Sequence, residues 1–182
     1  MGDAIHSTDL ASTEWKRRVQ EFASSEMFDR LFREGMGLVE EAASYLDGAG
    51  RVESRKLNRE LALVYAAESM EVTTRLMQAA SWLVVQRAVR EKDMKVEEAG
   101  DEKYRISPPG TPHPVDRDVM PEALMALVDR SRSLYERVWR FDAALYSDTP
   151  QPADNHVMKQ IDRLRAAAEG GAFDPLAGWR TR

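Results

Sequence analysis

The chain has 182 residues, of which 43% are hydrophobic and 31% charged, and its formal net charge is -5. This length and composition are typical of one soluble globular domain. The negative charge disfavours nucleic acid as a partner, because a phosphate backbone repels it. Cysteine is absent, which excludes disulfides, thiolate nucleophiles and zinc–thiolate sites.

The chain divides into three parts. Residues 1–24 form an N-terminal segment in which we expect a short helix at 12–23 and find no apolar core of a signal peptide. Residues 25–146 carry long helical apolar patterns and no convincing strand, so we predict an all-α fold, a three-helix bundle. Residues 147–182 are interrupted by Pro and Gly, so we predict a mobile C-terminal tail with one short amphipathic helix at 154–168.

The first helix of the bundle is predicted at residues 25–47, where apolar residues recur on one arc of the helix. Gly48 follows it in the position of a C-cap. Gly35 lies inside the apolar arc, and a glycine in the middle of a helix costs about 1 kcal/mol relative to alanine. We therefore expect a second helix to approach closely at Gly35.

The second helix, predicted at residues 54–94, is long and central and contains the most apolar run of the chain, AASWLVV. Only eleven residues separate Arg75 from Arg87, whereas a membrane span needs roughly 20 apolar residues. The run is therefore not a membrane anchor. Its apolar residues form two opposite stripes: Leu61, Tyr65, Val72, Leu76, Ala79 and Leu83 on one side, and Leu63, Ala67, Met70, Met77, Val84 and Ala88 on the other.

Two apolar faces predict that this helix is covered from two directions, by its own bundle and by a second copy of the chain. We therefore expect a homodimer, and the spacing leaves open which stripe faces the mate. The candidate residues for the dimer interface or the core are Leu76, Met77, Trp82, Leu83 and Val84. For Trp82, both core packing and anchoring of an interface are open interpretations.

The third helix is predicted to begin at Pro121, after a long Pro-rich connection at residues 95–120. In the tail, three apolar residues at three-residue spacing stand beside positive charge, a pattern that suits capture of an acidic, grooved partner. The candidate partner-binding residues are Phe173, Leu176, Trp179 and Arg180. The alternative is that these residues cap the bundle or have no role.

No arrangement of residues predicts an active site. The three histidines, His6, His113 and His156, lie far apart in predicted termini and loops. The Glu-x-x-His pattern of carboxylate-bridged metal sites does not occur on the helices, and neither a phosphate-binding loop nor a dinucleotide fingerprint is present. We therefore predict a non-enzymatic protein with no cofactor and no metal.

Two groups of basic residues are candidates for binding surfaces. Those of the third helix, Arg130, Arg132, Arg137 and Arg140, share its surface with acidic residues and do not predict a DNA-binding helix. The second group comprises Arg51, Arg55, Lys56 and Arg59. We interpret it as a solvated face, with a docking patch for an acidic partner as the alternative.

Three stretches of the sequence resemble a known family. The segments FREGMGLVEEAASYLDGAGR, AAESMEVTTRLMQAASWLVVQRAV and EEAGDEKYRI are similar to the regulator of CtrA degradation (RcdA) family of alphaproteobacteria, over roughly residues 26–146. The resemblance implies a small helical dimer that serves as an adaptor for the ClpXP protease. Such adaptors join a protease already primed by a response-regulator-like partner and deliver substrate proteins, among them cell-cycle regulators.

This resemblance implies protein binding without catalysis, regulation of proteolysis, and a cytoplasmic location with concentration at a cell pole as an option. The family has no catalytic motif that could be matched to residues of this sequence, and the resemblance does not indicate which substrates are delivered. Two alternatives stay open. One is a dimeric scaffold or localisation factor with no role in delivery, and the other is a ligand-binding or enzymatic helical bundle, which would need a pocket with converging polar groups.

Overall fold

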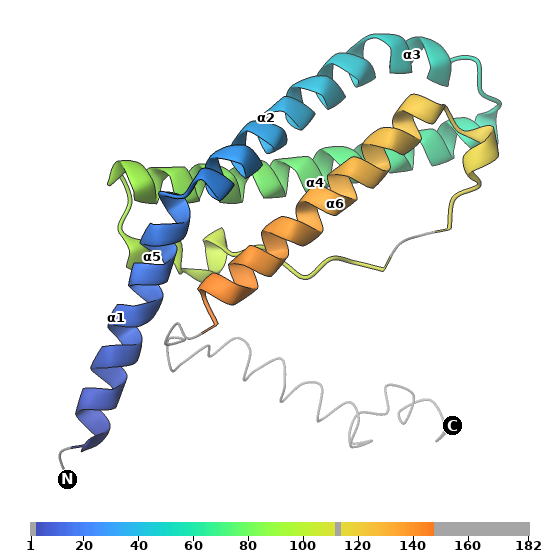
Figure 1. Ribbon diagram of the computed structural model, residues 1–182. Helices are drawn as coiled ribbons and strands as arrows, with labels where there is room; N and C mark the ends of the chain where they lie inside the picture. Colours follow the sequence, from blue (N-terminus) through green and yellow to red (C-terminus); the bar gives the residue numbers. More distant parts are fainter. Residues whose placement is uncertain (1–2, 112–113, 148–182) are drawn as a thin grey trace, which may run out of the picture. The chain divides into compact units, whose positions relative to one another are not determined.

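The computed structural model describes the backbone of residues 3–111 and 114–147, and the side chains of these residues from Thr13 onward. They belong to one compact unit that extends to Thr149. All regular structure in the described residues is helical (Figure 1). The elements are α1 (Asp3–Ala23), α2 (Glu26–Asp47), α3 (Ala49–Ser54), α4 (Arg59–Glu91), α5 (Val96–Ala99), the 3-10 helices η1 (Glu102–Tyr104) and η2 (Arg117–Val119), and α6 (Glu122–Leu145).

Helices α2, α4 and α6 form the predicted all-α bundle, with α4 as the central member because it contacts both of the others (Figure 1). Each helix contributes almost fully buried apolar side chains to the core. These include Phe28 and Leu38 of α2, Leu83 of α4, and Leu134 and Val138 of α6. Their removal from water is the main source of the bundle's stability.

Helix α1 is a further long helix, which packs against α4, α5 and α6. Its buried residues are Trp15, Val19, Phe22 and Ala23, and the ring of Phe22 lies 4.9 Å from that of Phe141. The sequence predicted a short helix from residue 12, but α1 begins at Asp3. The prediction followed the apolar pattern, which starts near Trp15, whereas no Pro or Gly interrupts residues 3–11 and a formed helix propagates readily.

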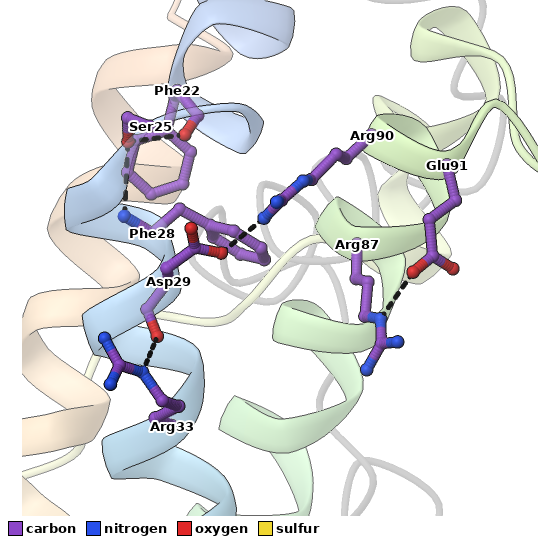
Figure 2. A network of polar contacts seen from close by, with 8 residues as sticks. All are labelled: Phe22, Ser25, Phe28, Asp29, Arg33, Arg87, Arg90 and Glu91. Atoms are coloured by element: carbon purple, nitrogen blue, oxygen red, sulfur yellow. Dashed lines mark hydrogen bonds and ion pairs between the residues drawn. The ribbon is translucent and has the colours of Figure 1, made fainter.

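The turn between α1 and α2 is held by Ser25, the N-cap of α2 (Figure 2). Its hydroxyl accepts a hydrogen bond from the Phe28 amide at 3.2 Å and donates one to the Phe22 carbonyl at 2.7 Å. In the next turn, Asp29 forms an ion pair with Arg90 near the end of α4. The start of α2 is therefore fixed both to the end of α1 and to α4.

Gly35 lies at a close approach of α4 to α2, and the sequence predicted a close approach of a second helix there. A Cβ atom at this position would lie 2.6 Å from Cδ1 of Leu83, which is fully buried. At the end of α2, Gly48 is the C-cap, and its amide donates to the carbonyls of Ser44 and Tyr45. Both predictions for these glycines are confirmed.

Helix α4 is shorter than the single helix predicted at residues 54–94. It begins at Arg59, because the side chain of Asn58 caps it by accepting a hydrogen bond from the Leu61 amide at 2.9 Å. It ends at Glu91, followed by Lys92 in the left-handed conformation, with φ at 65°. Of the predicted residues before Asn58, only Ser54 is helical, as the last residue of the separate short helix α3.

The connection at residues 95–120 contains α5, η1 and η2 and is tied to the bundle by polar contacts. Arg105 forms an ion pair with Asp142, and its guanidinium lies 4.6 Å from the ring centroid of Tyr146. The Tyr135 hydroxyl donates to the Ser107 carbonyl at 3.0 Å. Burial raises the pKa of Tyr146 to about 12. The predicted tail at 147–182, with its helix at 154–168, lies outside the described residues from residue 148 onward.

Candidate functional site

The two apolar stripes of α4 have different surroundings. Val72, Leu76, Ala79 and Leu83 are buried against α2 and α6. This inner stripe is the core face of the helix.

The opposite stripe of α4 is exposed. We define the outer stripe as Leu63, Met70, Met77 and Val84, which follow one another at intervals of seven residues. Their exposed fractions are 68%, 71%, 64% and 52%, respectively. Exposed apolar side chains are ordinary when they stand singly, but a contiguous row of them marks an interaction surface.

Small side chains border the outer stripe on both sides. They are Ala66, Thr73 and Ala80 on one side, and Ala67, Thr74 and Ser81 on the other. Residues three or four apart are neighbours on a helix surface, so Met70 and Met77 each stand between small side chains. Of the charged residues within the same length of α4, Glu68 is buried, and the Arg75 guanidinium donates to Val128 and Ser131 of α6. Glu71 is exposed and lies 3.7 Å from the Arg75 side chain. The outer stripe can therefore meet another helix at close range without burying a charge.

The five interface-or-core candidates separate into two groups. Leu76, Trp82 and Leu83 are buried in the core, whereas Met77 and Val84 belong to the outer stripe. Trp82 is 2% exposed, and its indole Nε1 donates to the Asp142 carboxylate at 2.8 Å. It is therefore a core residue with a satisfied polar atom.

The tail candidates Phe173, Leu176, Trp179 and Arg180 lie outside the described residues. Leu63 and Met70 belong to a predicted apolar stripe but not to the predicted interface candidates. The seven-residue spacing that links them to Met77 and Val84 is the signal that finds them.

A hollow of about 370 Å³ opens next to Met77, between α4 and η1. Its lining includes Ser81, Trp82 and Val85 of α4, with Tyr104 and Ile106 of the connection. Because Trp82 and Val85 are buried, the hollow has an apolar floor. It extends the apolar surface sideways from the middle of the outer stripe.

Chemistry other than binding has little support in this region. Within residues 13–111 and 114–147, no group of three or more His, Asp or Glu side chains is arranged to hold a metal ion. The described helices include none with the length and apolar character that a membrane crossing requires. The buried carboxylate of Asp142 is internally satisfied by Trp82 and Arg105.

Comparison with known proteins places the chain in a family. A family model described as "Protein of unknown function (DUF1465)" matches residues 19–168. The chain belongs to this family. A solved structure of RcdA from Caulobacter crescentus CB15 is 54% identical to the chain, covers 70% of this chain and 98% of that one, and has a TM-score of 0.59. The resemblance to the RcdA family is thereby confirmed, and none of the curated proteins matches.

Proposed function

We propose that the protein is a homodimeric, non-enzymatic adaptor that helps deliver cell-cycle regulators to the ClpXP protease. The observation that carries the binding role is the outer stripe of α4, an exposed apolar row on the central helix of the bundle. Similarity to RcdA supports the protease-related part of the proposal. The partners would be a second copy of the chain, a protease primed by a response-regulator-like protein, and substrate proteins, all in the cytoplasm.

The mate in the homodimer is the outer stripe of a second copy. A row that repeats every seven residues fits the face of another helix with the same repeat. In a two-fold dimer the same surface serves both subunits, and the outer stripe is self-complementary in chemistry because it is apolar along its length. Methionines at Met70 and Met77 add flexible side chains that fill irregular gaps in an interface.

The alternative of an enzyme or ligand-binding bundle would use another hollow of about 400 Å³, whose lining includes Glu68, Arg75 and Arg132. The hollow beside Met77 has an apolar floor but no cluster of groups that could transfer protons or activate a nucleophile. A scaffold without delivery activity shares the dimer with the adaptor, so only a functional assay separates these two roles.

The dimer is tested by replacing the two central residues of the outer stripe. Met70→Glu with Met77→Glu would place charges in the apolar contact, and we expect sedimentation to show monomers at concentrations where the unaltered protein is dimeric. A dimer of about -8 kcal/mol is populated at ~50 µM. Met27→Glu, on an exposed apolar residue of α2, is the matched control and should leave the dimer intact. A monomeric unaltered protein at that concentration would refute the dimer.

The delivery role is tested in a reconstituted degradation assay. ClpXP, the priming response regulator and a cell-cycle regulator are combined with and without the protein, and the rate of substrate loss is measured. We expect faster loss when the protein is present and no acceleration when the priming partner is omitted. Dimerisation without any acceleration would favour the scaffold alternative.

A further inference from the structure

A third hollow lies at the corner formed by the end of α2, helix α3 and the first turns of α4. Its volume is about 440 Å³. The lining comes from three elements: Leu46 of α2, Arg51 and Arg55 at α3, and Ala62, Tyr65 and Ala66 of α4. It is separate from the hollow beside Met77, with which it shares no lining residue.

The floor of this corner is apolar and roomy. Tyr65 is buried, Leu46 is partly buried, and the alanines at positions 62 and 66 leave space above them. The absence of a side chain at Gly50 lets Tyr65 and Tyr45 pack against the backbone there. A Cβ atom at this position would lie 2.4 Å from the Tyr65 hydroxyl and 2.8 Å from the Tyr45 ring. The corner therefore offers a preformed seat for one bulky apolar side chain.

The rim of the corner is positively charged. Arg51 and Arg55 are exposed, and neither forms an ion pair within the described residues. The nearby carboxylate of Glu53 is engaged elsewhere, since it accepts a hydrogen bond from the Tyr45 hydroxyl at 2.7 Å. Among the described residues, no carboxylate lines the hollow.

Some other surface arginines of the protein are ion-paired. Arg117 pairs with Asp129 at 2.6 Å, and Arg130 pairs with Glu41 at 2.6 Å. The guanidinium groups of Arg51 and Arg55 give the α3 corner an uncompensated positive rim, in a chain whose net charge is -5. Arginine beside an apolar seat is a common composition of protein-binding hot spots.

We propose that this corner docks an acidic segment of a partner protein, which places one bulky apolar side chain in the hollow and its carboxylates against Arg51 and Arg55. The apolar seat favours a polypeptide over a nucleic acid, whose backbone offers charge but no such side chain. The proposal rests on the proposed binding role and assigns it a second contact surface, with a partner of stated chemistry.

The test uses a synthetic acidic peptide of alternating Asp and Glu with one central Phe, added to the isotope-labelled full chain. We expect amide shifts in the NMR spectrum to concentrate on residues 51–55 and 62–69. Replacing the central Phe by Ala should weaken binding by about fivefold, because the apolar anchor is lost. Raising the salt concentration should weaken it further, since the rim contacts are exposed to solvent.

Variants of the chain distinguish a local effect of Arg51 and Arg55 on peptide binding from the effect of the net charge of the protein. Arg51→Glu with Arg55→Glu should weaken binding of the peptide at least tenfold. Arg33→Glu with Arg140→Glu changes the net charge equally at exposed positions of α2 and α6 and should have little effect. Ala62→Phe, which fills the hollow, should abolish the advantage of the Phe peptide over the Ala peptide while leaving the rim charges intact.

Three outcomes would overturn the proposal. The first is equal binding of the Phe and Ala peptides, and the second is an equal loss of binding in the two double arginine variants. The third is complete displacement of the peptide by single-stranded DNA, with DNA binding unchanged in the Ala62→Phe variant. The last outcome would assign the corner to a polyanion. Failure here is distinguishable from failure of the dimer, because the Met70→Glu, Met77→Glu variant retains the corner and should still bind the peptide.

Discussion

Arg105 and Asp142 form an ion pair that joins the long connection to the last helix of the bundle. The Nε of Arg105 lies 2.9 Å from each oxygen of the Asp142 carboxylate, whose side chain is only 3% exposed. The same carboxylate accepts a hydrogen bond from the Trp82 indole. Asp142 thus holds together α4, α6 and the segment after η1.

Asp142→Ala should therefore destabilise the protein strongly. The substitution leaves the Arg105 guanidinium and the Trp82 Nε1 without their acceptor, and removing one partner of a buried pair costs about 3 kcal/mol. The change in the free energy of unfolding is measured by urea denaturation. Asp129→Ala is the control, because its pair with Arg117 is exposed and should shift the urea midpoint little. Equal effects of the two substitutions would show that the buried pair has no special role.

Two glycines of α2 should respond oppositely to alanine. A Cβ atom added at Gly37 would meet no other atom within 4 Å, so Gly37→Ala should stabilise the protein by about 1 kcal/mol through helix propensity. Gly35→Ala should lose that gain, because its methyl group would collide with Leu83 in the packed core. Thermal unfolding of both variants tests the difference, and equal stabilisation would mean that α2 and α4 separate easily at this point.

Lys92→Gly should stabilise the protein. Lys92 has a positive φ of 65°, which costs an ordinary residue roughly 1 kcal/mol and glycine almost nothing. Lys95→Gly is the matched control, because Lys95 has a φ of -74° and glycine there only adds freedom to the unfolded chain. We expect a higher melting temperature for the first variant and an unchanged or lower one for the second. A lower melting temperature for Lys92→Gly would indicate contacts of the lysine side chain that outweigh the backbone term.

Truncation after Ser147 should leave the bundle folded. The compact unit formed by residues 1–149 contains every core residue found in the described part of the chain, so we expect little change in melting temperature. If the protein is an adaptor as proposed, we also expect that delivery of some substrates to ClpXP is lost, because Phe173, Leu176 and Trp179 of the tail are the predicted partner-binding residues. A large drop in melting temperature would contradict the expected stability of the truncated bundle. Unchanged degradation of all substrates would contradict the expected role of the tail in delivery.

Much of the bundle could be predicted from the sequence because its local signals are strong. Gly48 predicted the end of α2 as its C-cap, and Gly35 indicated the close approach of a second helix. The ends of α4 were predicted less well. Asn58 is a good N-cap, but the apolar pattern continues past it, and nothing in the spacing shows that Lys92 takes a left-handed conformation.

The site was predictable only in outline. Helical periodicity places Leu76 and Met77 on different faces of α4. Because both faces are apolar, the periodicity does not show which of them the bundle covers. That choice depends on tertiary packing, by which the inner face contacts both α2 and α6. The role of Arg105 was also missed, because its partner Asp142 is distant in the sequence and no local pattern connects them.

The seven-residue interval of the outer stripe has a geometric consequence for two joined molecules. Seven residues fall short of two full turns of an α-helix, so the row rotates about 20° around α4 with each repeat. From Leu63 to Val84 the accumulated rotation is about 60°, and two straight rods laid parallel would lose contact toward their tips. A crossing angle of about 20° restores contact along more of the row. In the proposed dimer, Met70 and Met77 would then lie at the crossing point of the two α4 helices.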